Sequence, residues 1–206
     1  MVMQDFIGGK MVYIGGNLGK GKTVTCAKML FEDWLLGKKI YSDFHLDFPS
    51  KEEMRELGYI VEDPEFLAIR SNVDLRRFLR MMEDNELDNC TVGFDEFYLT
   101  AGSNRSASLV NQIIVAYATT IRKGATDLYL VSPEETDIDR KVRRYIHLEL
   151  HPNLDEKTGL CRVKIYNRKY KEWSTLTYDA KEIFPLYNTR EKPGIPQYLK
   201  KATFTR

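Results

Sequence analysis

Residues 16–23 have the sequence GNLGKGKT and fit the pattern G-x-x-x-x-G-K-[ST] at every position. The apolar run Met11–Ile14 comes before them, and apolar side chains recur at steps of three and four residues over 23–36. This order predicts a buried strand, a glycine turn and a helix. In that arrangement successive backbone N–H groups and the positive end of the helix dipole point at one anion, so the segment indicates a phosphate-binding loop.

The last two residues of this loop have separate expected roles. Lys22 is expected to place its charge on the β- and γ-phosphates, and the Thr23 hydroxyl is expected to ligate Mg²⁺. Lys20 has two interpretations, because its side chain can face either a nucleotide or only solvent. A chance match has a frequency below about 1 % in a chain of this length, which favours nucleotide binding. The residues expected to contact the nucleotide are Asn17, Leu18, Gly19, Lys20, Gly21, Lys22, Thr23 and Val24.

A second candidate group follows the apolar run Cys90–Phe94, which predicts another buried strand ending in Asp95 and Glu96. A carboxylate at a strand end beside a phosphate loop can hold Mg²⁺ through water, and we assign this role to Asp95. Glu96 is then expected to orient and deprotonate the water that attacks the γ-phosphate. The chain has no N-K-x-D element, which excludes a GTPase of the Ras type.

Two further candidates lie on either side of the apolar run Leu128–Val131. An arginine from a neighbouring subunit can neutralise charge on the transferred phosphate, and Arg122 is the candidate for that role. The alternative is that Arg122 and Lys123 only favour the negative end of a helix. Ser132 ends the expected strand, where it either senses the γ-phosphate or is simply buried.

Expected strands alternate with expected helices, which predicts an α/β P-loop fold with a mainly parallel central sheet flanked by helices. The helix at 109–123 is expected to face the core with Leu109, Ile113, Ala116 and Ile121. We expect one domain over 1–206, with a core at about 8–150 and a C-terminal β-hairpin and tail at about 160–206. Strands are expected at 11–14, 39–42, 90–94, 128–131, 145–150, 162–166 and 173–178, and helices at 23–36, 51–57, 73–83, 109–123 and 137–144.

Composition and charge narrow the class of protein. Of 206 residues, 43 % are apolar and 30 % are charged, which excludes a disordered or collagen-like chain. Three cysteines without C-x-x-C spacing favour a reducing compartment, and no membrane span is expected. Residues 41–100 hold 15 acidic and 6 basic side chains, whereas 160–206 hold 4 acidic and 11 basic ones. The basic end either faces a polyanion or forms a solvated surface.

The motifs together resemble the FtsK–HerA superfamily of DNA-pumping ATPases. The resemblance covers about residues 8–150 and rests on GNLGKGKT, KKIYSD, TVGFDEF, IRKGATDLYLVS and DIDRKVRR. Within the superfamily the chain is similar to compact viral members. These are the genome-packaging ATPases of icosahedral viruses with internal membranes and the Zot-like assembly ATPases of filamentous phages.

The resemblance implies roles for particular residues. It implies ATP and Mg²⁺ as cofactors, with Lys22 and Thr23 in the first motif and Asp95 and Glu96 in the second. It implies that Arg122 acts on the ATP of the next subunit. Where the family often has a Thr-Gln pair as its polar sensor, this chain has Ser132 followed by proline.

The resemblance also implies partners and a setting. It implies a homo-oligomeric ring, a hexamer by family usage, with double-stranded DNA in its channel and a viral capsid or its packaging vertex as partner. The expected location is the host cytoplasm during virus assembly, or the virion.

The function expected is ATP-driven packaging of double-stranded DNA into a preformed capsid. The alternatives are Zot-like phage export, a small-molecule P-loop kinase and a nucleotide-binding scaffold. Arg105 and the run Arg140–Arg144 are candidates for DNA or subunit contacts, or ordinary surface charge.

Overall fold

Seven strands form one sheet in the order β2-β3-β4-β1-β5-β6-β7. The structure is a computed structural model that describes residues 9–58, 75–84, 86–97 and 109–187. Strands β1 to β5 run parallel to their neighbours, and β6 and β7 continue the sheet antiparallel. The strands are β1 Met11–Gly15, β2 Lys39–Ser42, β3 Cys90–Phe94, β4 Asp127–Ser132, β5 Leu148–Leu154, β6 Leu160–Asn167 and β7 Glu172–Asp179.

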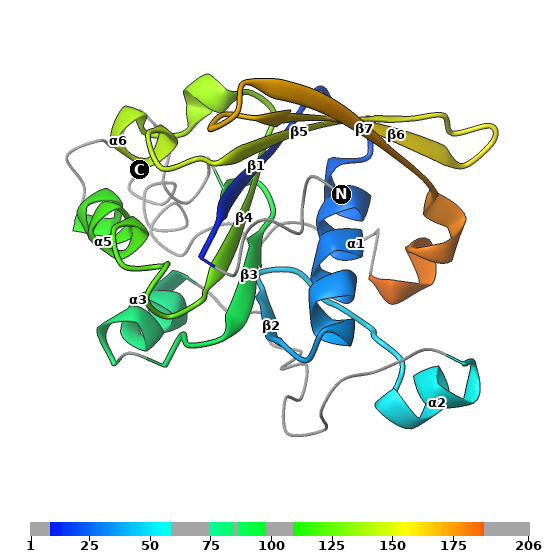
Figure 1. Cartoon of the computed structure of the whole chain (residues 1–206), viewed down its shortest axis with the longest axis horizontal. Coiled ribbons are helices and arrows are strands. Elements are labelled where there is room, and N and C mark those ends of the chain that lie inside the picture. The colour runs from blue at the N-terminus through cyan, green and yellow to red at the C-terminus, as the bar shows by residue number, and fades with distance from the viewer. Residues whose placement is uncertain (1–8, 59–74, 85, 98–108, 188–206) are drawn as a thin grey trace, which may run out of the picture.

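Helices cover both faces of the sheet, and the sheet separates the core into two apolar clusters. On one face α1 packs with the end of the described chain, and on the other lie α3, α5 and α6 (Figure 1). The helices are α1 Lys22–Leu35, α2 Lys51–Glu56, α3 Leu75–Glu83, α5 Leu109–Ala118 and α6 Arg140–Arg143, with 3-10 turns η2 Glu135–Asp137, η3 Ala180–Glu182 and η4 Phe184–Leu186. None of the described helices is long and apolar enough to cross a membrane.

Helix α1 lies close against β3 because β3 contains a glycine. A Cβ at Gly93 would come within 2.7 Å of Leu30 Cδ1 and 3.1 Å of Cys26 Sγ. Leu30 and Cys26 are fully buried, so a larger side chain at Gly93 would displace the Leu30 side chain or the helix. This contact fixes the helix that begins at the phosphate loop against the strand that ends at Asp95.

Most expected elements are confirmed, including the mainly parallel sheet and the C-terminal hairpin β6–β7. The helix expected at 51–57 ends at Glu56 and begins with a capping box formed by Ser50 and Glu53. The expected strand at 145–150 is shifted, since β5 begins at Leu148 and continues to Leu154. In place of one helix at 137–144, the structure has η2, which ends at Asp137, and α6, which begins at Arg140. The two are separate because Asp139 is the N-cap of α6, and its side chain accepts a hydrogen bond from the Lys141 N–H.

The helix expected at 109–123 is wrong in its end and at one expected core position, whereas Ile113 packs against the core as expected. The helix stops at Ala118, where the Thr119 and Thr120 hydroxyls donate to backbone carbonyls three residues earlier and compete with helical hydrogen bonds. Its buried positions include Ile114 and Ala118, while Ala116 is exposed. Ile121 is buried as expected, but it lies in the turn that leads to β4.

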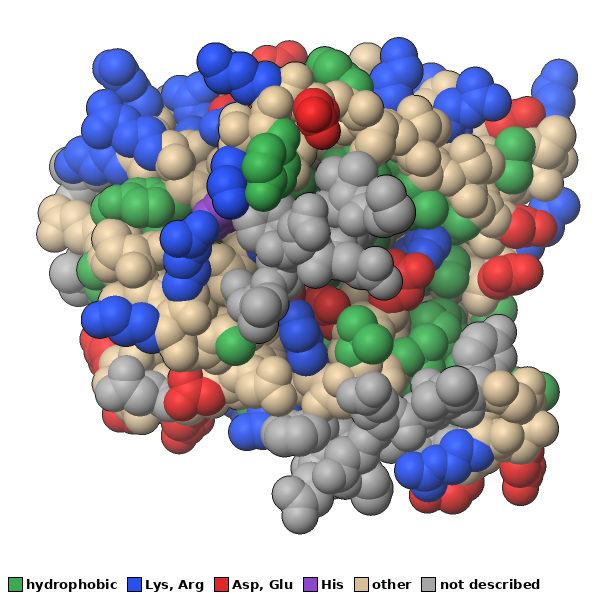
Figure 2. Space-filling view, in the orientation of Figure 1, with side chains coloured by type: hydrophobic (Ala, Val, Ile, Leu, Met, Phe, Trp, Pro, Cys, Tyr) green, Lys and Arg blue, Asp and Glu red, His purple; other side chains and the backbone are tan. Residues whose placement is uncertain are grey.

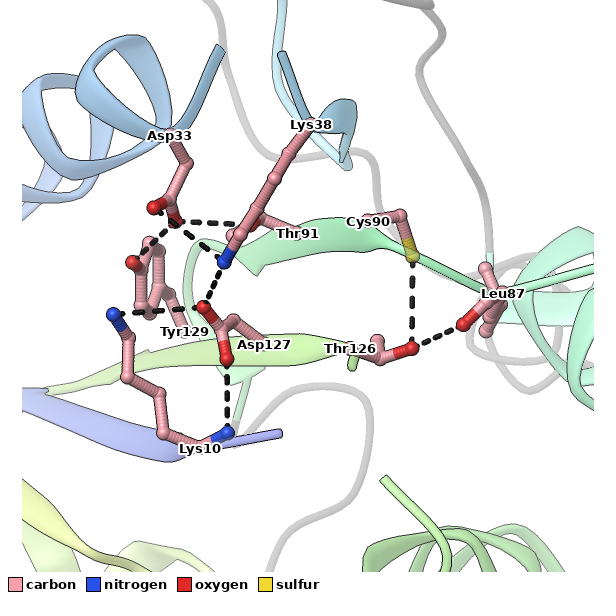
Figure 3. A network of polar contacts seen from close by, with 9 residues as sticks. All are labelled: Lys10, Asp33, Lys38, Leu87, Cys90, Thr91, Thr126, Asp127 and Tyr129. Carbon is pink, nitrogen blue, oxygen red and sulfur yellow. Dashed lines mark hydrogen bonds and ion pairs between the residues drawn. The ribbon is translucent and has the colours of Figure 1, made fainter. Parts of the chain in front are cut away.

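A buried polar network ties the amino-terminal ends of the strands to the end of α1 (Figure 3). Asp127, fully buried at the start of β4, forms ion pairs with Lys38 and Lys10 and accepts the Lys10 backbone N–H at 2.9 Å. Asp33 in α1 accepts hydrogen bonds from the Tyr129 hydroxyl at 2.5 Å and the Thr91 hydroxyl at 2.9 Å. Burial alone lowers the pKa of Lys38, but Asp33 and Asp127 outweigh it and raise that pKa.

Asp127→Ala should lower the free energy of unfolding by about 3–5 kcal/mol, because it leaves the buried Lys10 ammonium without its counter-charge and Lys38 paired with Asp33 alone. Glu32→Ala is the matched control, since it breaks a half-exposed i,i+4 pair with Lys28 on α1 and should cost less than about 0.5 kcal/mol. Urea denaturation measures both. Equal small losses would contradict a supporting role for the network.

Candidate functional site

The phosphate loop joins β1 to α1 with the backbone that its glycines permit. Gly16, Gly19 and Gly21 have φ values of 134°, 77° and 88°, a region that other residues rarely adopt. Gly21 is the N-cap of α1, and among the described residues no side chain caps this helix. The first N–H groups of α1 are therefore directed at the loop, where an anion can accept them.

The two neighbouring strands hold the loop from both sides. The Gly16 N–H donates to the Pro133 carbonyl, just beyond β4, at 3.0 Å. The Leu154 N–H in β5 donates to the Lys20 carbonyl at 3.1 Å. The pairing of β1 with β5 ends at Ile14 and Leu150. Pro152 has no backbone N–H, and it is tolerated in β5 because it lies beyond this pairing. The extension of β5 past β1 thus becomes a side wall for the loop.

The expected metal ligands meet in the structure. The Thr23 hydroxyl, in the first turn of α1, donates to Asp95 Oδ2 at 2.9 Å, although the two residues are 72 positions apart. The Lys22 ammonium donates to the Asn17 carbonyl at 3.2 Å and stays over the loop. A hydroxyl and a carboxylate are hard oxygen ligands that suit Mg²⁺, so Thr23 and Asp95 fit a magnesium site beside the phosphate loop.

The surroundings of Asp95 favour a bound cation. Burial raises the pKa of this carboxyl, the hydrogen bond from Thr23 lowers it, and the charge of Glu96 raises it again, with a net upward shift. The ionised carboxylate is therefore held in a place that disfavours its charge. A divalent cation at this position would relieve that cost.

Asp43 is a site residue that the sequence analysis missed. It follows β2, and its Oδ1 accepts the Asp95 backbone N–H at 2.7 Å, while its own N–H donates to the Gly93 carbonyl at 3.2 Å. The next N–H, that of Glu96, donates to Asp95 Oδ1 at 3.1 Å, and Glu96 has a φ of 49°. These bonds hold a turn with an unfavourable backbone conformation at Glu96, directly after the metal-binding candidate Asp95. The signal was the aspartate that ends KKIYSD, at the tip of the strand beside β3.

Ser132 lies at the carboxyl end of β4, next to Gly15 in the strand register. It is fully buried, and its hydroxyl donates to Asp137 Oδ2 in η2 at 3.3 Å. The structure therefore brings Ser132 to the phosphate loop, as expected of a sensor, and gives its hydroxyl a carboxylate partner. The sensing role stays a prediction.

Arg122 does not meet the other candidates. It comes before the start of β4 and lies against Gly9 before β1, at the amino-terminal ends of the strands. Six residues of β4 separate it from the phosphate loop by about 20 Å along the strand. Any action of Arg122 on a nucleotide must therefore be on that of a neighbouring subunit. Arg105 lies outside the described residues.

Comparisons with known proteins agree on the fold. No protein-family model matches the sequence, and no curated protein matches it either. Among solved structures, the N-terminal domain of zonular occludens toxin from Neisseria meningitidis matches 87 % of this chain and 98 % of that domain, with a TM-score of 0.59 and 17 % identity. The chain has a P-loop NTPase fold.

The same fold occurs in viral packaging proteins. The genome packaging NTPase B204 of Sulfolobus turreted icosahedral virus 2, in complex with ATP-gammaS, matches 81 % of this chain and 96 % of its own, with a TM-score of 0.53 and 10 % identity. The DNA-packaging ATPase B204 of Sulfolobus turreted icosahedral virus matches 82 % and 98 %, with a TM-score of 0.53 and 13 % identity. The expected resemblance is confirmed at the level of the fold.

Asp95→Asn should stabilise the protein at pH 7 in the absence of Mg²⁺ and nucleotide, by on the order of 1 kcal/mol. A carboxyl whose pKa is raised by folding contributes stability below its ordinary pKa and loses it as the pH rises through the raised value. The gain should therefore shrink as the pH falls through the raised pKa toward about 4 and should be smallest below it. Urea denaturation in EDTA across this range measures it.

Asp84→Asn, which changes an exposed carboxylate just after α3, is the control and should change the free energy of unfolding by less than about 0.5 kcal/mol. A loss of stability in Asp95→Asn at pH 7, or a gain that does not depend on pH, would contradict the account of the Asp95 environment.

Proposed function

We propose that this protein is an NTPase that binds ATP with Mg²⁺ and hydrolyses the γ-phosphate. The observation that carries the proposal is the hydrogen bond between Thr23 and Asp95 beside an intact phosphate loop. Few other activities need a metal-binding hydroxyl, a metal-binding carboxylate and an anion-binding helix start at one point. Small-molecule phosphotransfer is the rival activity, and phosphorylated nucleosides or nucleotides among the products would reveal it.

Each residue of the site has a task in this reaction. The amides of the phosphate loop and the Lys22 ammonium hold the β- and γ-phosphates, and Thr23 and Asp95 hold the metal. When bound, Mg²⁺ supplies positive charge that neutralises the β- and γ-phosphate oxygens. Glu96 orients a water molecule and takes its proton as the water oxygen bonds to the γ-phosphorus and the oxygen shared with the β-phosphate leaves with ADP.

ATP hydrolysis by this protein drives the movement of DNA. The protein forms a homo-oligomeric ring in which Arg122 of one subunit completes the ATP site of the next and Ser132 senses the γ-phosphate. The ring moves double-stranded DNA into a preformed viral capsid in the host cytoplasm. The fold likeness to the B204 packaging proteins supports this use, and the likeness to the zonular occludens toxin domain supports filamentous phage export as the second candidate.

Glu96→Gln should abolish turnover and keep nucleotide binding, because it removes the base and leaves the phosphate loop intact. We expect the rate of phosphate release from ATP to fall at least about a hundredfold. Calorimetric titration with a non-hydrolysable ATP analogue should give an unchanged Kd. Duplex DNA should stimulate the wild-type rate.

Unchanged turnover in Glu96→Gln would remove Glu96 from the mechanism. A wild-type protein that binds nucleotide without hydrolysing it would favour a nucleotide-dependent scaffold over an enzyme. A rate that ignores duplex DNA would contradict the translocation proposal.

A further inference from the structure

Strands β5, β6 and β7 have one face on the core and one face without any described helix. Their inner residues, such as Leu150 and Val163, pack in the α1 cluster. The opposite side chains form three rows across the three strands, set by the antiparallel register, and one of them is Glu149, Tyr166 and Trp173. We call the other two rows the outer face, and its members are His151, Lys164 and Thr175 in one row and Asn153, Arg162 and Thr177 in the other.

We propose that the outer face binds the phosphate backbone of duplex DNA. This proposal rests on the proposed function and assigns the surface by which the protein would hold its DNA. Arginine, lysine, threonine and asparagine are the side chains that contact DNA phosphates most, and five of the six members are of these types. Arg162 and Lys164 are two residues apart on β6, which separates their charges by about 7 Å along the strand.

The positive charge of the outer face is unpaired. Arg162 and Lys164 are exposed, and neither forms an ion pair with a described residue. Two acidic side chains lie on this side of the strands. Glu149 accepts a hydrogen bond from Arg168 Nε at 2.6 Å and shares that guanidinium with Glu135, and Asp179 at the end of β7 accepts the Lys181 N–H. Figure 2 shows lysine and arginine side chains along the upper margin of the molecule, over this end of the sheet. The unpaired charges of Arg162 and Lys164 attract a polyanion.

One member of the outer face, and one ion-pair bridge from the neighbouring row, contact elements of the nucleotide site. Lys20 of the phosphate loop donates to Asn153 Oδ1 at 3.2 Å. Arg168 bridges Glu149 in β5 to Glu135 in η2, which follows the β4 end that carries Ser132, with both distances 2.6 Å. A change in the loop on hydrolysis would therefore reach these strands through direct contacts, as a DNA-moving surface requires.

An aromatic group at the end of the rows makes single-stranded DNA the competing ligand. Trp173 is 62 % exposed and lies 4.9 Å from the Tyr166 ring and 6.0 Å from the His151 ring, between centroids. Exposed rings can stack on unpaired bases, which a duplex does not offer. The rows of donors favour the duplex backbone, because they outnumber the single well-exposed ring.

The test is the double variant Arg162→Ala/Lys164→Ala, measured by fluorescence anisotropy with a labelled 30-base-pair duplex. We expect the Kd to rise about tenfold or more. The plot of the logarithm of the association constant against the logarithm of the salt concentration should become less steep by about 2, since two phosphate contacts are lost. ATP hydrolysis without DNA should stay unchanged, and its stimulation by DNA should be lost. Arg55→Ala/Arg80→Ala removes two exposed charges from α2 and α3 and should leave the Kd within about twofold.

Four other results of this experiment would each overturn one part of the proposals. An equal loss in Arg55→Ala/Arg80→Ala would mean that total charge, and not the outer face, binds DNA. Tighter binding of a single strand that is lost in Trp173→Ala would replace the duplex with single-stranded DNA. A wild-type protein that hydrolyses ATP and binds neither DNA would overturn the outer face and leave the ATPase proposal intact. A protein that binds the duplex through these residues without hydrolysing ATP would keep the outer face and overturn the ATPase.

Discussion

The hydrogen bond from the Thr23 hydroxyl to Asp95 connects two segments that no strand pairing brings together. Strand β4 lies between β1 and β3, so the phosphate loop and the acidic turn meet only above the carboxyl ends of the sheet. Parallel strands bring their carboxyl ends to one edge, and this topology makes that edge the natural place for a ligand.

The two ends of the sheet do different work. At the amino-terminal end, Asp127 and Asp33 form a buried, well-paired network that fixes β1, β3, β4 and α1 together. At the carboxyl end, Asp95 is buried beside Glu96, and its pKa is raised. The buried carboxylates are thus paired with lysines at the end of the sheet where the elements are held together. At the other end, the surroundings of Asp95 disfavour its charge, at the place where a cation would bind. Such a division is common in proteins, whose binding sites reduce stability.

Local patterns predicted the parts of the site that depend on short stretches of chain. The segment around the loop from Gly16 to Thr23 and the strand that leads to Asp95 each combine a motif with a clear apolar pattern, and β1, α1 and β3 confirm the expected elements. Asp43 was missed because its partner is 52 residues away and depends on β2 lying beside β3. The end of α5 and the length of β5 were missed because threonine hydroxyls and the side wall of the loop, and not apolar periodicity, decide them.

The central claim is that the loop, Thr23 and Asp95 together enclose a triphosphate and its metal ion. A crystal structure of the protein with Mg²⁺ and a non-hydrolysable ATP analogue tests it most directly. The account predicts β- and γ-phosphates ringed by the loop amides, with the metal on the Thr23 oxygen and Asp95 within reach of its water ligands. A nucleotide bound elsewhere, or a metal ion distant from both side chains, would contradict it.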